Sequence, residues 1–253
     1  MSDQKITVSR RSLLKSSGML AGAAVTGGIV GHALTTESAS AAPQTTKLAP
    51  PPWKYVKLDP NEVAKQAYAD YKVRGCMYAA VNSFFELLGK KVGSPYTVIP
   101  AEMFAYGSGG IQGWGTICGA LNGAAVVLGL FAPKPDLALL VDELYNWYRN
   151  TSLPIFVPEG GEKKFLKTTP TDVLCHISMA GWTAEAEAPA KSPERKERCC
   201  RLAADVAKKT AEILNDYIKG KVPENQKLSG LDHDSNASVK MRCDFCHDAD
   251  EEE

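Results

Sequence analysis

This 253-residue sequence has no excess of charge of either sign, because 29 lysines and arginines balance 29 aspartates and glutamates. It therefore lacks the basic surplus typical of nucleic-acid-binding proteins, and we expect no nucleic acid among its partners. Histidine is scarce, with four residues, so histidine-dependent chemistry has few candidates. The hydrophobic fraction of 44% is ordinary for a globular protein and argues against collagen-like, coiled-coil and wholly disordered chains.

The first 41 residues have the features of a twin-arginine export signal. Arg10 and Arg11 precede a short apolar stretch rich in glycine and alanine, and Ala39-Ser40-Ala41 offers the small residues that a signal peptidase needs. That stretch is too short to span a membrane comfortably, and no later segment has the required run of about 18 apolar residues. We therefore predict a periplasmic mature protein without stable membrane insertion. Because the twin-arginine route exports folded proteins, we also expect the core to acquire metal before export.

The mature chain is predicted to be all-α, because apolar residues recur at helical spacing and no convincing strand alternation occurs. We expect an irregular helical core, followed by a C-terminal arm that is too polar to fold alone without a ligand. The segments expected after the signal are an extended leader over residues 42–58, the core over 59–219 and the arm over 220–253.

Local signals predict where helices begin and end. Asp59-Pro60 and Ser192-Pro193 each combine a capping side chain with a proline in the first turn, and Gly89 is a predicted helix stop. Helices are predicted over residues 59–74, 76–88, 116–130, 136–150, 171–182 and 192–219, with loops over 107–115 and 151–170.

The C-terminal arm contains Cys243-Asp244-Phe245-Cys246-His247, which has the C-x-x-C-H spacing of a c-type haem attachment site. The alternative, a thioredoxin-like dithiol, is expected at a helix start after a strand rather than in an acidic tail. We therefore predict haem c bound through thioethers to Cys243 and Cys246, with His247 as the proximal iron ligand.

Two histidines are candidates for the sixth ligand of the haem iron. His233 lies ten residues before Cys243, where it can bind the haem of its own subunit or that of a partner subunit. A neutral imidazole suits a low-spin electron-transfer haem. His176 directly follows Cys175, where it can instead form hydrogen bonds near whatever Cys175 binds. We favour His233, with His176 as the alternative.

Five further cysteines stand at predicted helix starts or on predicted buried faces: Cys76, Cys118, Cys175, Cys199 and Cys200. None is paired in a C-x-x-C, so the spacings of rubredoxins, zinc ribbons and ferredoxins are absent. Four thiolates from separate helical segments can converge on one iron–sulfur cluster. Disulfides, which would leave one odd thiol, and inert buried cysteines are the two alternatives that spacing leaves open.

The segments Gly75-Cys76-Met77-Tyr78-Ala79 and Gly115-Thr116-Ile117-Cys118-Gly119-Ala120-Leu121-Asn122-Gly123, followed by Cys175 and Cys199-Cys200, resemble the C-GCAxxG-C-C redox family. With the export signal and the haem box, the mature chain resembles the split-Soret class of c-type cytochromes. That resemblance implies a homodimer with one bis-histidine haem c and one [2Fe–2S] cluster per subunit.

The same resemblance implies the cluster ligands. These are Cys76, Cys118, Cys175 and one member of the vicinal pair Cys199-Cys200. Neighbours on a helix point about 100° apart, so only one of the pair is expected to face the cluster. We favour Cys199, with Cys200 as the alternative.

The favoured function is electron transfer in the periplasm, with redox proteins as partners. A rival from another class is an oxidoreductase that reduces a small oxyanion at an open haem position or at the vicinal cysteines. A weaker alternative is a haem-only cytochrome with disulfides in its core. The state of the haem iron and the sulfide content would separate these three.

Overall fold

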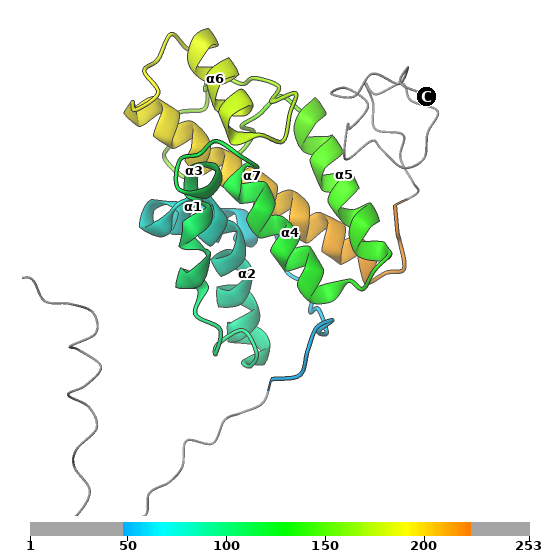
Figure 1. Cartoon of the computed structure of the whole chain (residues 1–253). Helices are drawn as coiled ribbons and strands as arrows, with labels where there is room; N and C mark the ends of the chain where they lie inside the picture. Colours follow the sequence, from blue (N-terminus) through cyan, green and yellow to red (C-terminus); the bar gives the residue numbers. More distant parts are fainter. Residues whose placement is uncertain (1–47, 224–253) are drawn as a thin grey trace, which may run out of the picture. The chain divides into compact units, whose positions relative to one another are not determined.

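The computed structural model describes residues 48–223, and this part of the chain is helical with no strand (Figure 1). The all-α prediction is therefore confirmed for these residues. The export signal, His233, the haem box and the acidic end lie outside the described residues. The helical elements are α1 (Pro60–Arg74), α2 (Cys76–Val92), η1 (Ala101–Gly107), α3 (Ser108–Ile111), α4 (Gly119–Phe131), α5 (Asp136–Asn150), α6 (Cys175–Glu185) and α7 (Pro193–Tyr217).

The starts of α1 and α7 follow their predicted capping signals. The Asp59 carboxylate accepts a hydrogen bond from the backbone N–H of Asn61 at 2.8 Å. The Ser192 hydroxyl likewise accepts from the N–H of Arg195 at 3.1 Å. In each helix a proline takes the first position, where its missing N–H removes no hydrogen bond of the helix. Both starts are confirmed.

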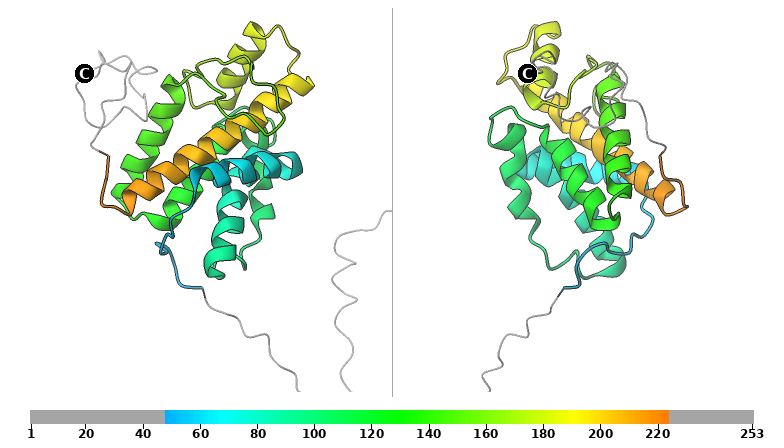
Figure 2. Two further views of the ribbon diagram at one scale, coloured as in Figure 1. Left: turned by 180° about the vertical axis from the view of Figure 1, so that it is seen from behind. Right: turned by 45° about the vertical axis from the view of Figure 1, so that its right-hand side comes forward.

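The long helix α7 is central to the packing. It contacts α1, α2, α4, α5 and α6, and its N-terminal turns lie beside α6 (Figures 1 and 2). Its core face recurs at three- and four-residue steps, which explains why one side of so polar a helix is buried. The buried residues of this stripe are Cys200, Leu202, Ala203, Val206, Thr210, Ile213 and Leu214.

Close packing of α2 against α4 depends on two glycines one turn apart. A Cβ atom on Gly123 would lie 2.6 Å from the carbonyl oxygen of Met77, and one on Gly119 would collide with the carbonyl oxygen of Gly107. Eight of the 13 residues of α4 are buried and the other five are half-buried. Because these glycines have no side chain, the two helix backbones approach closely just where Cys76 and Cys118 are placed.

The predicted stop at Gly89 is wrong. Helix α2 continues through Gly89 to Val92 and ends at Gly93, whose φ is 72°. A left-handed φ favours glycine, so the residue that ends the helix is Gly93. Gly89 instead packs close to Thr97, where a Cβ atom would lie 3.1 Å from Thr97 Cγ2.

Two helices begin later than predicted. Helix α4 starts at Gly119 rather than residue 116, and α6 at Cys175 rather than residue 171, because the residues before them are extended and pair with each other. The N–H of Cys118 donates to the carbonyl of Val173 at 2.8 Å, and the N–H of Cys175 donates to that of Thr116 at 2.7 Å. This pairing joins segments far apart in the sequence and places two cysteines at neighbouring helix starts.

The loop prediction over residues 107–115 needs two corrections. The 3₁₀ helix η1, which was not predicted, ends at the first residue of this segment, Gly107, and α3 lies within the segment. Gly109 and Gly110 have φ of 65° and 66°, so α3 is an irregular turn rather than a regular helix. The second predicted loop, residues 151–170, is confirmed, with one isolated bridge between Leu153 and Thr168. No helix within residues 48–223 has both the length and the apolarity to cross a membrane.

Candidate metal centre

A cavity of about 270 Å³ lies where α7, α6 and the first residues of α2 and α4 meet. Four cysteines line it: Cys76, Cys118, Cys175 and Cys199. They come from four different helical elements and from positions up to 123 residues apart. The fold therefore brings together the four cysteines that the sequence analysis favours. None of the five cysteines of the described region is in a disulfide, contrary to the alternative with core disulfides.

The vicinal pair is divided by the helix. Cys199 lines the cavity, whereas Cys200 does not, and Cys200 is buried on another side of α7. Burial raises the pKa of the Cys200 thiol to about 12, and its charged neighbours are Glu197 and Lys72. This separation is expected for adjacent residues about 100° apart on a helix. Cys199 is thus placed to act with the other three cysteines, and Cys200 is not.

Three of the four cavity cysteines stand at helix N-termini. Cys76 is the first residue of α2, Cys175 is the first residue of α6, and Cys118 is the N-cap of α4. The first backbone N–H groups of a helix have no partner within the helix and carry partial positive charge. Such positions stabilise thiolates, so the fold supplies three sites suited to anionic sulfur.

The thiols of Cys76, Cys118 and Cys175 are nevertheless neutral at ordinary pH when they hold no metal. Burial raises the pKa of Cys76 and of Cys175 to about 12, and it also raises the pKa of Cys118. Hydrogen bonds from backbone N–H groups oppose this rise, from Gly109 to Cys76 and from Leu121 to Cys118. Metal binding at this cavity would therefore release protons.

A hydrogen-bonded group of three buried residues forms one wall of the cavity. Arg198 Nη2 donates to Ser178 Oγ at 2.7 Å, and the Tyr148 hydroxyl donates to the same oxygen at 2.8 Å. All three residues line the cavity. Tyr148 also interacts with the thiol of Cys118, so α5, α6 and α7 are connected beside the cysteines.

The glycine-rich segment, residues 107–115, borders the cavity on another side. Ile111 and Gln112 have φ of 61° and 50°, a conformation that is uncommon for residues other than glycine and rare for a β-branched one. Strain of this kind concentrates at functional sites. Trp114 from this segment lines the cavity yet is 83% exposed, so it stands at the mouth. Exposed His176 lies at the same mouth.

The donor set fits a polynuclear centre better than a single ion. Within residues 48–223, no three cysteine, histidine or acidic side chains converge closely enough to bind one metal ion. A structural zinc site needs four ligands around one atom, whereas an iron–sulfur cluster spreads its thiolates over several irons. The cavity has four free cysteines, and the sulfur of one of them, Cys76, accepts hydrogen bonds from backbone N–H groups of two segments. This arrangement suits an iron–sulfur cluster better than a single zinc ion.

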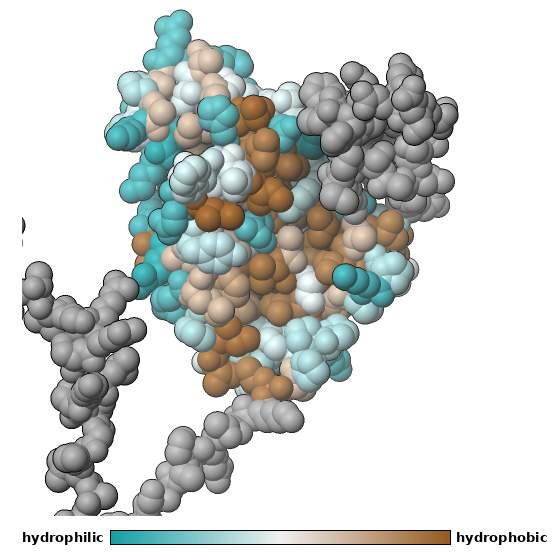
Figure 3. Space-filling model, viewed as in Figure 1, coloured by the Kyte–Doolittle hydropathy of each residue, from teal (hydrophilic) through white to brown (hydrophobic). Residues whose placement is uncertain are grey.

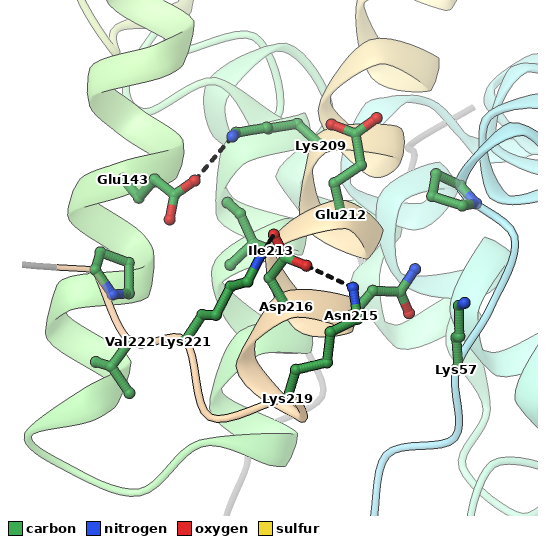
Figure 4. A pocket seen from close by; sticks show the side chains of 12 residues that line it. Lys57, Glu143, Lys209, Glu212, Ile213, Asn215, Asp216, Lys219, Lys221 and Val222 are labelled. Atoms are coloured by element: carbon green, nitrogen blue, oxygen red, sulfur yellow. Dashed lines mark hydrogen bonds and ion pairs between the residues drawn. The ribbon is translucent and has the colours of Figure 1, made fainter.

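A second hollow lies at the other end of α7 and has a different character (Figure 4). Its charged side chains are largely paired, with Lys209 Nζ 2.8 Å from Glu143 and Lys219 Nζ 2.8 Å from Asp216. No cysteine or histidine of the described residues lines it. It therefore offers neither thiolate nor imidazole ligands, and its charges largely compensate one another.

Sequence reasoning missed the wall formed by Arg198, Ser178 and Tyr148. One signal was present: Arg198 precedes Leu202 by four residues and so continues the apolar stripe of α7 towards its N-terminus. A buried arginine is rare unless it has a partner, so an arginine at a stripe position indicates a polar site nearby.

Comparison with known proteins identifies the family. The family model described as "Putative redox-active protein (C_GCAxxG_C_C)" matches residues 77–213. The chain belongs to this family. The matched region contains Cys118, Cys175 and Cys199 and begins directly after Cys76, so it coincides with the helices that build the cavity.

The chain also matches a named protein and a solved structure. The chain is 46% identical over 172 residues to the split-Soret cytochrome c of Desulfovibrio desulfuricans, and the match covers 66% of this chain and 62% of that protein. The solved structure of the split-Soret cytochrome c from the same organism, described as having a novel iron centre, matches with a TM-score of 0.67 and 41% identity. This second match covers 77% of this chain and 81% of that one. The predicted resemblance is confirmed.

Proposed function

We propose that this chain is an electron-transfer protein with an iron–sulfur centre in the cysteine cavity and a c-type haem on its C-terminal arm. The observation that carries the proposal is the convergence of Cys76, Cys118, Cys175 and Cys199 on one cavity. The similarity to a cytochrome c and to a protein with a novel iron centre supports it.

The centre we propose is a [2Fe–2S] cluster with the four cavity cysteines as ligands. When bound, such a cluster accepts and releases single electrons. The protein's part is to hold the thiolates at helix N-termini, to bring the Gly109 N–H to the sulfur of Cys76, and to bury the thiols of Cys76 and Cys118. Its redox potential follows from these contacts and from nearby charge.

The haem we propose is attached at Cys243 and Cys246, with His247 as the proximal ligand and His233 as the sixth ligand. His176 is less suited to bind haem iron, because it stands at the mouth of the cysteine cavity beside Cys175. There it is better placed to form hydrogen bonds near the iron–sulfur centre.

We further propose export by the twin-arginine route, a periplasmic location and a homodimer. Support for the dimer comes from one face of the described region, where hydrophobic residues gather over α4 and towards α5 (Figure 3). A contiguous apolar area on a folded protein is typical of a contact surface. Redox proteins would be the physiological partners.

The first test is the content of iron and sulfide in the vicinal variants. The full chain would be produced in a host that exports it folded and attaches haem c, and non-haem iron and acid-labile sulfide would be measured per haem. We expect Cys199→Ser to lose most of its sulfide and Cys200→Ser, the matched control on the same turn of α7, to keep it.

The haem content should be equal in both variants, because the proposed haem ligands lie in another segment. Wild-type protein without sulfide would refute the proposed function. Wild-type sulfide in Cys199→Ser would show instead that the fourth ligand is assigned wrongly.

A further inference from the structure

Arg198 is a buried charge without a carboxylate partner. Its side chain is 2% exposed, and no aspartate or glutamate within residues 48–223 forms an ion pair with it. In the described part of the chain, Arg198 Nε is the single buried side-chain nitrogen or oxygen without a hydrogen-bond partner. An uncompensated buried cation costs several kcal/mol, so its retention in the fold calls for a compensating anion.

The surroundings of Arg198 indicate where that anion is. It lines the cysteine cavity, and the groups near it that can carry negative charge are Cys199, Tyr148 and Cys118. Two of these are proposed ligands of the iron–sulfur centre. The guanidinium is held by Ser178 Oγ at 2.7 Å, and Tyr148 donates to the same oxygen. The cation is therefore fixed beside the cavity.

A centre held by four thiolates is anionic, and it becomes more negative by one charge when it accepts an electron. A fixed cation in a buried, weakly polar site stabilises the more negative state over the less negative one. This effect raises the reduction potential. Arginine suits the role, because it stays protonated in a buried site and its planar group can donate to several acceptors at once.

We propose that Arg198 is the counter-charge that raises the reduction potential of the iron–sulfur centre, and that Ser178 and Tyr148 position its guanidinium. This inference rests on the proposed function, because it requires the centre in the cavity. Arg198 is not a catalytic residue in this proposal, since it acts only through its charge on the iron–sulfur centre.

Potentiometric titration of the iron–sulfur centre in the purified full-length protein tests this proposal. The variants are Arg198→Gln, which removes the charge, Arg198→Lys, which keeps it, and Ser178→Ala, which removes the acceptor. Lys196→Gln is the matched control, because it removes the same charge from an exposed position two residues away on α7. Iron and sulfide per chain would be measured in every sample.

We expect the equilibrium constant for reduction to fall at least about tenfold in Arg198→Gln, a drop of about 59 mV for one electron. Ser178→Ala should show a smaller drop, and Arg198→Lys should stay closer to wild type than Arg198→Gln. Lys196→Gln should leave the potential almost unchanged, because solvent screens its charge.

Three results would overturn the inference while leaving the proposed function intact. The first is an unchanged potential in Arg198→Gln at full iron occupancy, and the second is an equal drop of the potential in Lys196→Gln. The third is loss of iron in both Arg198 variants, which would show that the shape of the arginine side chain, not its charge, is what the site requires. If only Arg198→Gln loses its iron, the test rests on the potential of Arg198→Lys. A near wild-type potential in Arg198→Lys supports the proposal, and a strongly lowered potential refutes it. Absence of iron and sulfide from the wild-type protein would instead refute the proposed function itself.

Discussion

Asp205 holds the long loop between α5 and α6 against α7. Its Oδ2 accepts a hydrogen bond from the N–H of Ile155 at 2.7 Å, and its Oδ1 accepts one from the N–H of Phe156 at 2.8 Å. The carboxylate is buried, and this burial raises its pKa to about 6 despite the two hydrogen bonds. The fold thus favours the protonated form, while the two N–H donors keep the group in place.

This raised pKa predicts a pH-dependent stability. Because the folded-state pKa lies above the unfolded value of 3.8, the contribution of Asp205 to stability is full below about pH 4 and is lost as the pH rises through about 6. The free energy of unfolding of the wild type, relative to Asp205→Asn, should therefore fall by about 2–3 kcal/mol between pH 4 and pH 7.5. Urea denaturation of both proteins across this range measures it.

The two proteins share every other titrating group, so their difference isolates Asp205. A difference that stays constant from pH 4 to pH 7.5 would contradict the raised pKa of this carboxyl group.

The site residues differ in how far they were predictable from the sequence. Cys76, Cys118, Cys175 and Cys199 could be proposed because the cysteine pattern resembles that of the C-GCAxxG-C-C redox family, whereas spacing alone left disulfides and inert buried cysteines open. Arg198 was not predicted, because in the sequence it stands among the charged residues that open a polar helix, and its four-residue spacing from Leu202 is the one sign that it continues the apolar stripe. Its burial depends on α5 and α6, which approach it only in the folded chain.

Among the elements, α4 begins at the cysteine cavity, directly after Cys118. Gly119 begins this helix, and a Cβ atom there would collide with the carbonyl oxygen of Gly107 and with the sulfur of Cys76. We predict that Gly119→Ala destabilises the fold by about 1–3 kcal/mol and lowers the iron content, because the backbone of the site has no room to move aside. Thermal unfolding and iron analysis would measure the two effects.

Gly129 on the same helix provides the control. A Cβ atom there would meet only Leu137 Cδ2 at an ordinary distance of 3.7 Å. Gly129→Ala should therefore stabilise the protein by about 0.5–1 kcal/mol through helix propensity, with unchanged iron content. Equal effects of the two substitutions would show that close packing at Gly119 has no special role.

Helix boundaries were predictable where the determinant is local. Asp59 and Ser192 cap their own helices, so α1 and α7 begin as predicted. The starts of α4 and α6 were misplaced, because they depend on the bridge between Ile117 and Leu174, which are 57 residues apart. A single-sequence pattern holds no sign of that pairing, although it aligns two of the four cysteines.

At the scale of the whole molecule, the proposed function places two redox groups in one chain. The described helices provide the cysteine cavity, and the arm with the haem box continues from the end of α7. In the proposed protein, electrons would pass between the two centres before they leave for a partner protein.

Reductive titration of the purified full-length protein, which counts the electrons that each chain accepts, tests this central claim most directly. One haem and one cluster predict about two electrons per chain, one recorded by the haem absorption bands and the other by a separate iron–sulfur signal. A chain that accepts about one electron, with the haem bands as the only change, would contradict the account.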